Sequence, residues 1–236
     1  PRDRGGRRRG AMMSSPRVVA VIQARMGSTR LPGKVLRELE GRAVLGWTVR
    51  AAQAARLVDE VIVATSVLDE DDAIIAYAED LGVRAVRGSA DDVLDRFHTA
   101  IDGVEADVVV RLTSDCPMLD PQVIDDVVAL WINDRELDYV ATTLVRTLPR
   151  GLDVELATRA ALDRAWSEAE GFHRSHVTSW LYRDGSDARR AGIVFAPTAS
   201  DLRITLDVEE DLALLTALTA ITGDRIVPHS ELIALL

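Results

Sequence analysis

Short runs of consecutive apolar residues alternate along the chain with longer segments in which apolar residues recur every three or four positions. A continuous apolar run is typical of a strand buried on both faces, whereas the longer spacing predicts a helix with one buried side. The predicted strands span residues 18–22, 60–65, 83–86, 107–112, 137–142, 193–195 and 202–206, and a loop at 151–156 leads into one more short strand. The predicted helices span residues 44–57, 69–81, 91–101, 121–131, 158–169, 173–182 and 209–221.

This alternation of strands and helices predicts an α/β fold with a mainly parallel sheet and helices on both faces. The 236 residues suffice for one domain with a full hydrophobic core. No internal repeat, heptad pattern or linker interrupts the series. We therefore expect residues 17–236 to form a single domain.

The charges are unevenly distributed along the chain. The formal net charge is -10, but residues 1–16 contain five arginines and one aspartate, so the remaining residues carry -14. Such a surface repels nucleic acid and anionic membranes, so we expect neither as a partner, and an anionic ligand must bind in a local cationic pocket. We interpret residues 1–16 as a disordered basic leader or an expression remnant, with a nucleic-acid-binding arm as the alternative.

Two further features of the sequence indicate where the protein works. No apolar run reaches the roughly 20 residues that cross a bilayer, and the basic first dozen residues lack the apolar run of a secretory signal. The single cysteine, Cys116, cannot form an internal disulfide, so a reducing cytoplasm is expected. Because no histidine is near it in sequence, we interpret Cys116 as a small buried residue rather than a nucleophile.

One lysine, Lys34, stands among 28 basic residues, of which the other 27 are arginine. It ends the segment 23–34, which directly follows the first predicted strand. In open α/β sheets ligands bind beyond the carboxyl ends of the strands, so this segment is predicted to bind an anion, with a solvated turn as the alternative. Its glycines allow close backbone approach, and its hydroxyls and cations suit phosphate. These residues are Gly27, Gly33, Ser28, Thr29, Arg25 and Arg30.

The spacing within this segment excludes two common nucleotide-binding motifs. A Walker A motif needs four residues between its glycines and Ser or Thr after its lysine. Five residues separate Gly27 from Gly33, and Val35 follows Lys34. No G-x-G-x-x-G occurs in the chain either, which argues against a dinucleotide-binding dehydrogenase.

Two aspartates follow predicted strands. Asp115 comes after the strand at 107–112, and Asp207 after the strand at 202–206. Mg²⁺ takes one or two protein carboxylates together with phosphate and water oxygens, so this pair predicts a magnesium site. The alternatives are a turn aspartate before proline for Asp115 and a helix N-cap for Asp207. The acids at 69–71 have D-x-D metal-site spacing, but they open a predicted helix, where they offset the helix dipole.

Six ordered blocks, at residues 23–34, 91–96, 111–117, 151–155, 176–178 and 203–211, resemble the spore-coat polysaccharide F-type cytidylyltransferases. These enzymes are related to the CMP-KDO and CMP-nonulosonate synthetases, and the resemblance covers residues 17–236. It implies a three-layer Rossmann-like sandwich of the nucleotide-diphosphosugar transferase type, with a mainly parallel mixed sheet. Two positions depart from the family pattern: Ser114 stands where glycine is usual, and Ile204 where tryptophan is common.

The resemblance also implies a function: transfer of CMP from CTP to an acidic acceptor, with release of pyrophosphate. It leaves a keto sugar acid, a nonulosonic acid and a phosphonate open as the acceptor, and a homodimer open as the assembly. A nucleotidyltransferase using another NTP, a sugar transferase of the same fold and an inactive nucleotide-binding regulator are the alternatives.

The resemblance further assigns residues to each part of the site. Catalytic contacts to the triphosphate fall on Lys34, Arg25 and Arg30, and Mg²⁺ on Asp115 and Asp207. Nucleotide binding falls on Ala24, Gly27, Ser28, Thr65, Arg96 and Ser114, and acceptor binding on Arg150, Asp153, Glu155, Arg174 and His176. The alternative for the acceptor set, which also includes Arg146, is that its cations are solvated or paired with Asp153 and Glu155.

Overall fold

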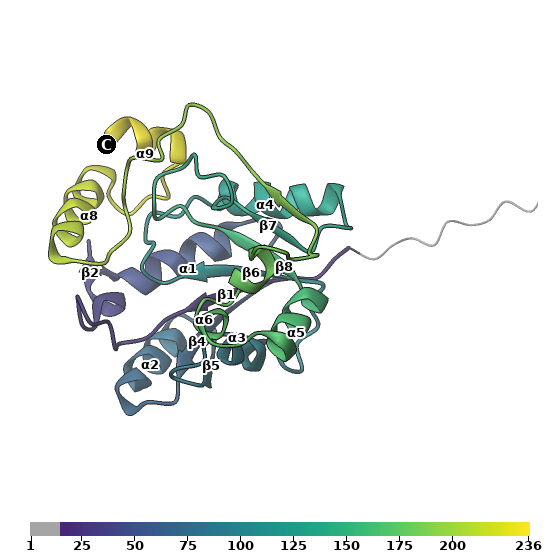
Figure 1. The fold of residues 1–236 in the computed structure, drawn as a ribbon. Coiled ribbons are helices and arrows are strands. Elements are labelled where there is room, and N and C mark those ends of the chain that lie inside the picture. Colours follow the sequence, from purple (N-terminus) through teal and green to yellow (C-terminus); the bar gives the residue numbers. More distant parts are fainter. Residues whose placement is uncertain (1–14) are drawn as a thin grey trace, which may run out of the picture.

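A seven-stranded mixed sheet in the order β5-β4-β1-β6-β8-β7-β9 forms the centre of the molecule (Figure 1). The structure, a computed structural model, describes residues 15–236. β5, β4, β1 and β6 are parallel, whereas β8 is antiparallel to both β6 and β7, and β9 is parallel to β7. The strands are β1 (Val18–Gln23), β4 (Glu60–Ser66), β5 (Arg84–Gly88), β6 (Val108–Thr113), β7 (Tyr139–Ala141), β8 (Glu155–Thr158) and β9 (Arg190–Gly192).

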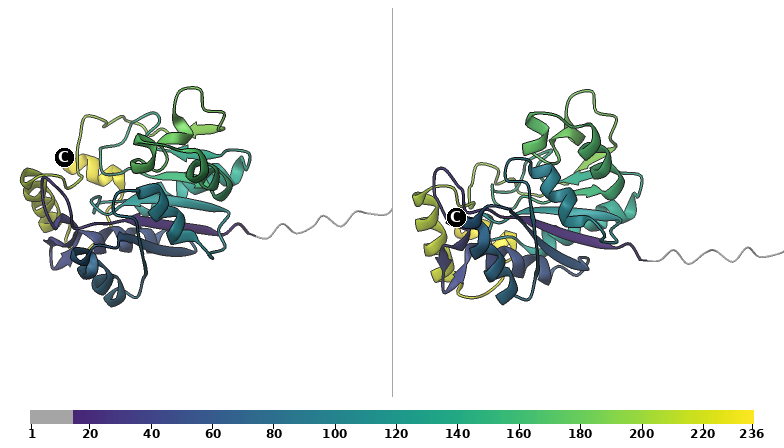
Figure 2. Two further views of the ribbon diagram at one scale, coloured as in Figure 1. Left: turned by 60° about the horizontal axis from the view of Figure 1, so that its bottom comes forward. Right: turned by 90° about the horizontal axis from the view of Figure 1, so that it is seen from below.

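Helices cover both faces of the sheet, as the continuous apolar runs indicate (Figure 2). Successive residues of β1 point to opposite faces: Val18, Ala20 and Ile22 join one buried cluster, and Val19 and Val21 the other. The first cluster contains residues of α1 (Val44–Ala54), α2 (Asp72–Asp80) and α4 (Pro121–Asn133). The second contains residues of α3 (Val93–Ile101), α5 (Arg159–Glu168) and α7 (Ser179–Tyr182). The three-layer α/β sandwich expected from the sequence is therefore confirmed.

The C-terminal part of the chain returns to the layer that contains α1. α8 (Glu209–Thr222) lies beside the short hairpin of β2 (Glu38–Leu39) and β3 (Arg42–Ala43), and α9 (His229–Leu235) follows it (Figure 1). Leu215, Leu218 and Leu232 bury their side chains in the first cluster. This return brings the segment before α8 next to the end of β6.

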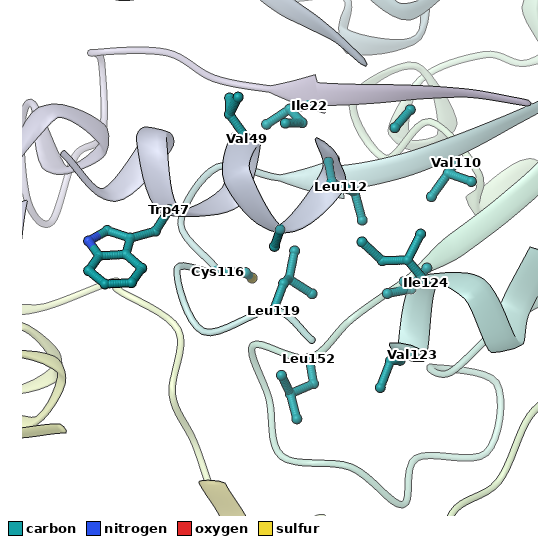
Figure 3. Packing of buried hydrophobic residues seen from close by; sticks show 14 of the residues in the cluster. Ile22, Trp47, Val49, Val110, Leu112, Cys116, Leu119, Val123, Ile124 and Leu152 are labelled. Carbon is teal, nitrogen blue, oxygen red and sulfur yellow. The ribbon is translucent and has the colours of Figure 1, made fainter. Parts of the chain in front are cut away.

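Cys116 lies inside the same cluster, among Val49, Leu119 and Ile124 (Figure 3). It is a free, buried thiol, as expected from the sequence. Burial, reinforced by the neighbouring carboxylate of Asp115, raises the pKa of the thiol well above its ordinary value. Cys116 therefore packs as a small apolar residue and is not a nucleophile.

The second half of the chain departs from the expected elements. Residues 202–206 form no strand, because their segment pairs with the sheet region only through an isolated bridge between Arg150 and Arg203. The edge strand is Arg190–Gly192 rather than 193–195. The predicted helix at 173–182 is two short helices, α6 (Phe172–Ser175) and α7, separated at Val177, whose φ is 36°. The sequence pattern gave no sign of α9 or of the β2–β3 hairpin, which are too short for a clear period.

Two smaller points concern the start of one helix and the first residues of the chain. The helix expected from residue 69 begins with a 3-10 turn, Asp69–Asp71. The proposed basic leader, residues 1–16, lies almost wholly outside the residues that the structure describes. Between residues 15 and 236, no helix combines the length and apolarity that a membrane span needs.

Candidate active site

A cavity of about 600 Å³ opens beyond the carboxyl ends of β1 and β6. It lies where an open α/β sheet places its ligands. Eleven of the residues proposed from the sequence line it: Ala24, Arg25, Ser28, Thr29, Arg30, Lys34, Arg96, Ser114, Asp115, His176 and Asp207. Gln23 and Asp91, which begin two of the sequence blocks, and Ser175, which precedes a third, also line the cavity. No pattern in the sequence assigned a role to these three residues.

The ammonium group of Lys34 lies between the two predicted metal ligands. Its Nζ donates to Asp115 Oδ2 at 2.6 Å, to the Leu206 carbonyl at 2.7 Å and to Asp207 Oδ1 at 2.8 Å. Burial alone would lower the pKa of Lys34, but Asp115 and Asp207 outweigh it and hold the pKa above its ordinary value. Lys34 is thus a buried cation that directly contacts two carboxylates.

The backbone around residue 206 positions Asp207, although no strand forms there. The Leu206 N–H donates to the Asp115 carbonyl at 2.8 Å, which carries Asp207 to the side of Asp115. Gly151 permits this approach, because it adopts φ 109° and a Cβ on it would lie 2.7 Å from the carbonyl carbon of Ile204. Close backbone packing therefore replaces the expected strand.

Asp207 does not cap α8, which was the structural alternative for this residue. The carboxylate of Asp211 instead accepts from the Asp207 and Val208 N–H groups, at 2.7 and 3.0 Å. The Asp207 carboxylate faces cations: Arg203 at 2.7 Å and Arg30 at 3.1 Å, besides Lys34. Burial would raise the pKa of Asp207, but hydrogen bonds from Lys34 and Arg203 hold it below its usual value, so the group is ionised.

Asp115 and Asp207 together offer a divalent metal two carboxylate groups. Within residues 15–236, no group of three or more His, Cys, Asp or Glu side chains could enclose a metal ion. A structural zinc site is therefore not formed there, since it needs four protein ligands. Two adjacent carboxylates fit Mg²⁺, which completes its shell with phosphate and water oxygens.

The segment after β1 is a wrapped loop held at both ends. The Met26 carbonyl accepts from Ser28 N–H at 2.7 Å and from Gly33 N–H at 3.0 Å. Gly33 adopts φ 67°, in the left-handed region that glycine tolerates, whereas Gly27 does not. Arg25 and Arg30 are exposed on this loop, and the Arg30 guanidinium pairs with Asp207 at 3.1 Å.

Asp71 fixes the loop after β1 through a backbone hydrogen bond, a role that the sequence did not indicate. One carboxylate oxygen accepts from Met26 N–H at 2.7 Å, and the other from Ser66 N–H at 3.0 Å. Burial would raise the pKa of Asp71, but these hydrogen bonds hold it below its usual value. The acids at 69–71 are thus not equivalent helix-start charges, and no sequence spacing signals the difference.

Arg96 also forms part of the cavity wall. Although 2% exposed, it has a buried Nε with no hydrogen-bond partner among the described residues, while its Nη1 donates to the Ser89 carbonyl at 2.6 Å. Gly88 lets α3 approach, because a Cβ there would lie 2.9 Å from the Cα of Arg96. Burial, followed by repulsion from Arg25, lowers the pKa of Arg96. A buried, incompletely paired cation is costly and is typical of a ligand site.

Several proposed residues lie outside the cavity wall. Thr65 is buried within β4, and Gly27 is exposed on the loop. Of the acceptor set only His176 lines the cavity. Arg150 is exposed, Arg146 pairs with Asp153 at 2.6 Å, Arg174 pairs with Asp92 at 2.6 Å, and Glu155 is buried against Arg111, Tyr139 and Thr178.

Comparison with known proteins shows which family the chain resembles. A family model described as cytidylyltransferase matches residues 19–212. The spore coat polysaccharide biosynthesis protein SpsF of Bacillus subtilis is 36% identical over 229 residues, which cover 93% of each chain.

Solved structures agree as well. A cytidylyltransferase from Leptospira borgpetersenii superposes with a TM-score of 0.89 at 28% identity and covers 93% of each chain. The structure of CMP:2-keto-3-deoxy-manno-octonic acid synthetase complexed with CTP has a TM-score of 0.67 at 21% identity, over 87% of this chain and 99% of that one, and shows the shared fold. The family model matches most of the chain, and SpsF is 36% identical over 93% of it. This chain therefore belongs to the cytidylyltransferase family, as its sequence motifs indicate.

Proposed function

We propose that the protein transfers CMP from CTP to an anionic acceptor and releases pyrophosphate. The observation that carries this proposal is the position of Lys34 Nζ between Asp115 and Asp207, at 2.6 and 2.8 Å, on the wall of a cavity at the end of β1. An ammonium group, two exposed loop arginines and two carboxylates in one cavity suit a metal-bound triphosphate. The intact set of Lys34, Asp115 and Asp207 argues against a binding protein that has lost catalysis.

Asp115 and Asp207 would hold Mg²⁺. When bound there, the ion neutralises charge on the phosphates and favours attack at phosphorus. The backbone contact between Leu206 and Asp115 keeps the two carboxylates adjacent before any ligand arrives. The pair therefore needs little reorganisation on binding.

The remaining groups act by binding and orienting. Arg25, Arg30 and Lys34 would hold the triphosphate, and Arg96, which also lines the cavity, would contact the nucleoside. The acceptor oxygen attacks the α-phosphorus in line with the leaving pyrophosphate, so catalysis rests on positioning and charge neutralisation. Lys34 would neutralise the negative charge that grows on the leaving group.

An acidic sugar or a phosphonate is the proposed acceptor. SpsF is described as a polysaccharide biosynthesis protein, and the synthetase of the same fold acts on a keto-deoxy sugar acid. Of the three arginines considered for the acceptor, Arg146 pairs with Asp153 and Arg174 with Asp92. Arg150 is exposed outside the cavity wall and has no carboxylate partner among the described residues.

The test is pyrophosphate release, measured with each of the four NTPs against keto sugar acids, nonulosonic acids and phosphonates. A neutral sugar of matched size serves as the control acceptor. We expect release only with CTP, a divalent metal and an acidic acceptor. Equal rates with all four NTPs, or release with the neutral sugar alone, would overturn the proposal.

A further inference from the structure

Glu155, at the start of β8, joins a buried polar cluster that lies outside the cavity wall. The side chain is 7% exposed, and its carboxylate accepts from the Arg111 guanidinium, the Tyr139 hydroxyl and the Thr178 hydroxyl, the last at 2.7 Å. Arg111 also donates from Nε to Gln23 Oε1 at 3.2 Å, and Gln23 lines the cavity. The cluster thus connects the floor of the cavity to the segment that contains Thr178.

The charge on the Glu155 carboxylate depends on the groups that donate hydrogen bonds to it. Burial alone would raise the pKa of Glu155, but Arg111, Tyr139 and Thr178 outweigh it and hold the pKa below its usual value. A buried ion pair adds little to stability compared with apolar side chains of the same volume. Its hydrogen bonds are directional, however, so it holds the attached segments in one arrangement.

The segment above this cluster is strained. Val177 is fully buried and has φ 36°, a conformation that is rare for a β-branched residue. Such a conformation persists only when the surroundings enforce it. Here the Val177 side chain is packed in the second hydrophobic cluster, and the adjacent Thr178 is bonded to Glu155.

The strained segment presents His176 at the cavity. The ring stacks on Phe172 with centroids 3.8 Å apart, and its Nδ1 lies 3.1 Å from the Phe172 carbonyl. A carbonyl only accepts, so in the neutral tautomer this contact places the proton on Nδ1 and leaves Nε2 as a hydrogen-bond acceptor. Of the residues proposed for the acceptor, His176 is the one on the cavity wall.

We infer that Glu155 is a positioning residue, which acts through Thr178 and Val177 to hold His176 where Nε2 accepts a hydrogen bond from an acceptor hydroxyl. This inference rests on the proposed function for the identity of the ligand. It assigns Glu155, buried away from the cavity, to the geometry of the site rather than to direct contact with the acceptor.

Two substitutions separate positioning from general packing. Thr178→Val and Tyr139→Phe each delete one hydroxyl that donates to the same Glu155 oxygen, but only Thr178 belongs to the segment of His176. We expect Thr178→Val to raise the KM for the acceptor about tenfold, the loss of one buried hydrogen bond, with the KM for CTP unchanged. Tyr139→Phe should alter both constants less than about twofold.

A double mutant tests whether Thr178 acts through His176. His176→Ala should weaken acceptor binding, and adding Thr178→Val should then have no further effect. Independent, additive effects of the two substitutions would overturn the inference, as would a change confined to the KM for CTP.

NMR of the histidine rings needs no catalytic turnover, so it distinguishes failure of this inference from failure of the proposed function. The chain has four histidines, so ring-nitrogen NMR signals are few, and His176→Ala identifies that of His176. We expect the Nδ1-protonated signature of His176 in the wild type and in Tyr139→Phe, and an averaged signature in Thr178→Val. Identical His176 signals in all three folded proteins would refute the positioning role even if CTP proved not to be the substrate.

Discussion

Replacing Lys34 by alanine removes the cation that joins Asp115 to Asp207. Three hydrogen bonds are lost, at 2.6, 2.7 and 2.8 Å, two of them to ionised carboxylates. Removing one partner of a buried ion pair costs about 3–5 kcal/mol. The two carboxylate side chains are 24% and 20% exposed, and Asp207 keeps Arg30 and Arg203. Solvent and these arginines screen the remaining charges, so we expect a loss of about 2–3 kcal/mol in the free energy of unfolding.

The effect on catalysis should be larger than the effect on stability. Loss of one preorganised group that stabilises transition-state charge lowers kcat by about 10²–10³, or about 2.7–4 kcal/mol. Lys34→Arg keeps the charge but should not restore kcat, because a planar guanidinium cannot reach three oxygens arranged around one ammonium.

The assay is steady-state pyrophosphate release with CTP and acceptor varied separately, beside thermal unfolding of each variant. Arg37→Ala is the matched control, since Arg37 is an exposed cation three residues further along and does not line the cavity. A kcat for Lys34→Ala within about twofold of the wild type would refute the reasoning, because the barrier would then be independent of this charge.

Three further predictions concern the supports of the site. Asp115→Asn should abolish pyrophosphate release and lower the affinity for Mn²⁺, followed by its electron paramagnetic resonance in the presence of CTP, while circular dichroism stays unchanged; full activity with excess EDTA would contradict the metal site. Asp71→Asn should destabilise the protein at pH 7, and because the folded pKa of Asp71 is lowered, the difference from the wild type in urea unfolding should shrink as pH falls below about 4. A constant difference down to low pH would show that Asp71 is not ionised in the folded state. Gly151→Ala should lower kcat as well as stability, because a Cβ 2.7 Å from Ile204 displaces the segment that carries Asp207; a change in stability alone would separate Gly151 from the site.

The amino-acid sequence by itself determined the sheet core and the loop after β1. Residues 18–22, 61–64 and 108–110 are continuous apolar runs, which are typical of strands covered on both faces by helices. The wrapped loop was also predictable, because its glycines, hydroxyls and single lysine lie within twelve consecutive residues. Both features depend on interactions between near neighbours in the chain, which leave a readable pattern.

Tertiary structure alone decided which charges face one another. Asp207 reaches Asp115 through backbone contacts between segments about ninety residues apart, and not through the strand that its sequence indicated. In the sequence, Asp71 looks like an ordinary helix-start acid, and Glu155 looks like an acceptor ligand. In the structure, both carboxylates are buried and accept hydrogen bonds from distant segments. A buried carboxylate must find donors wherever the packed chain supplies them, and sequence spacing carries no record of partners brought together only by folding.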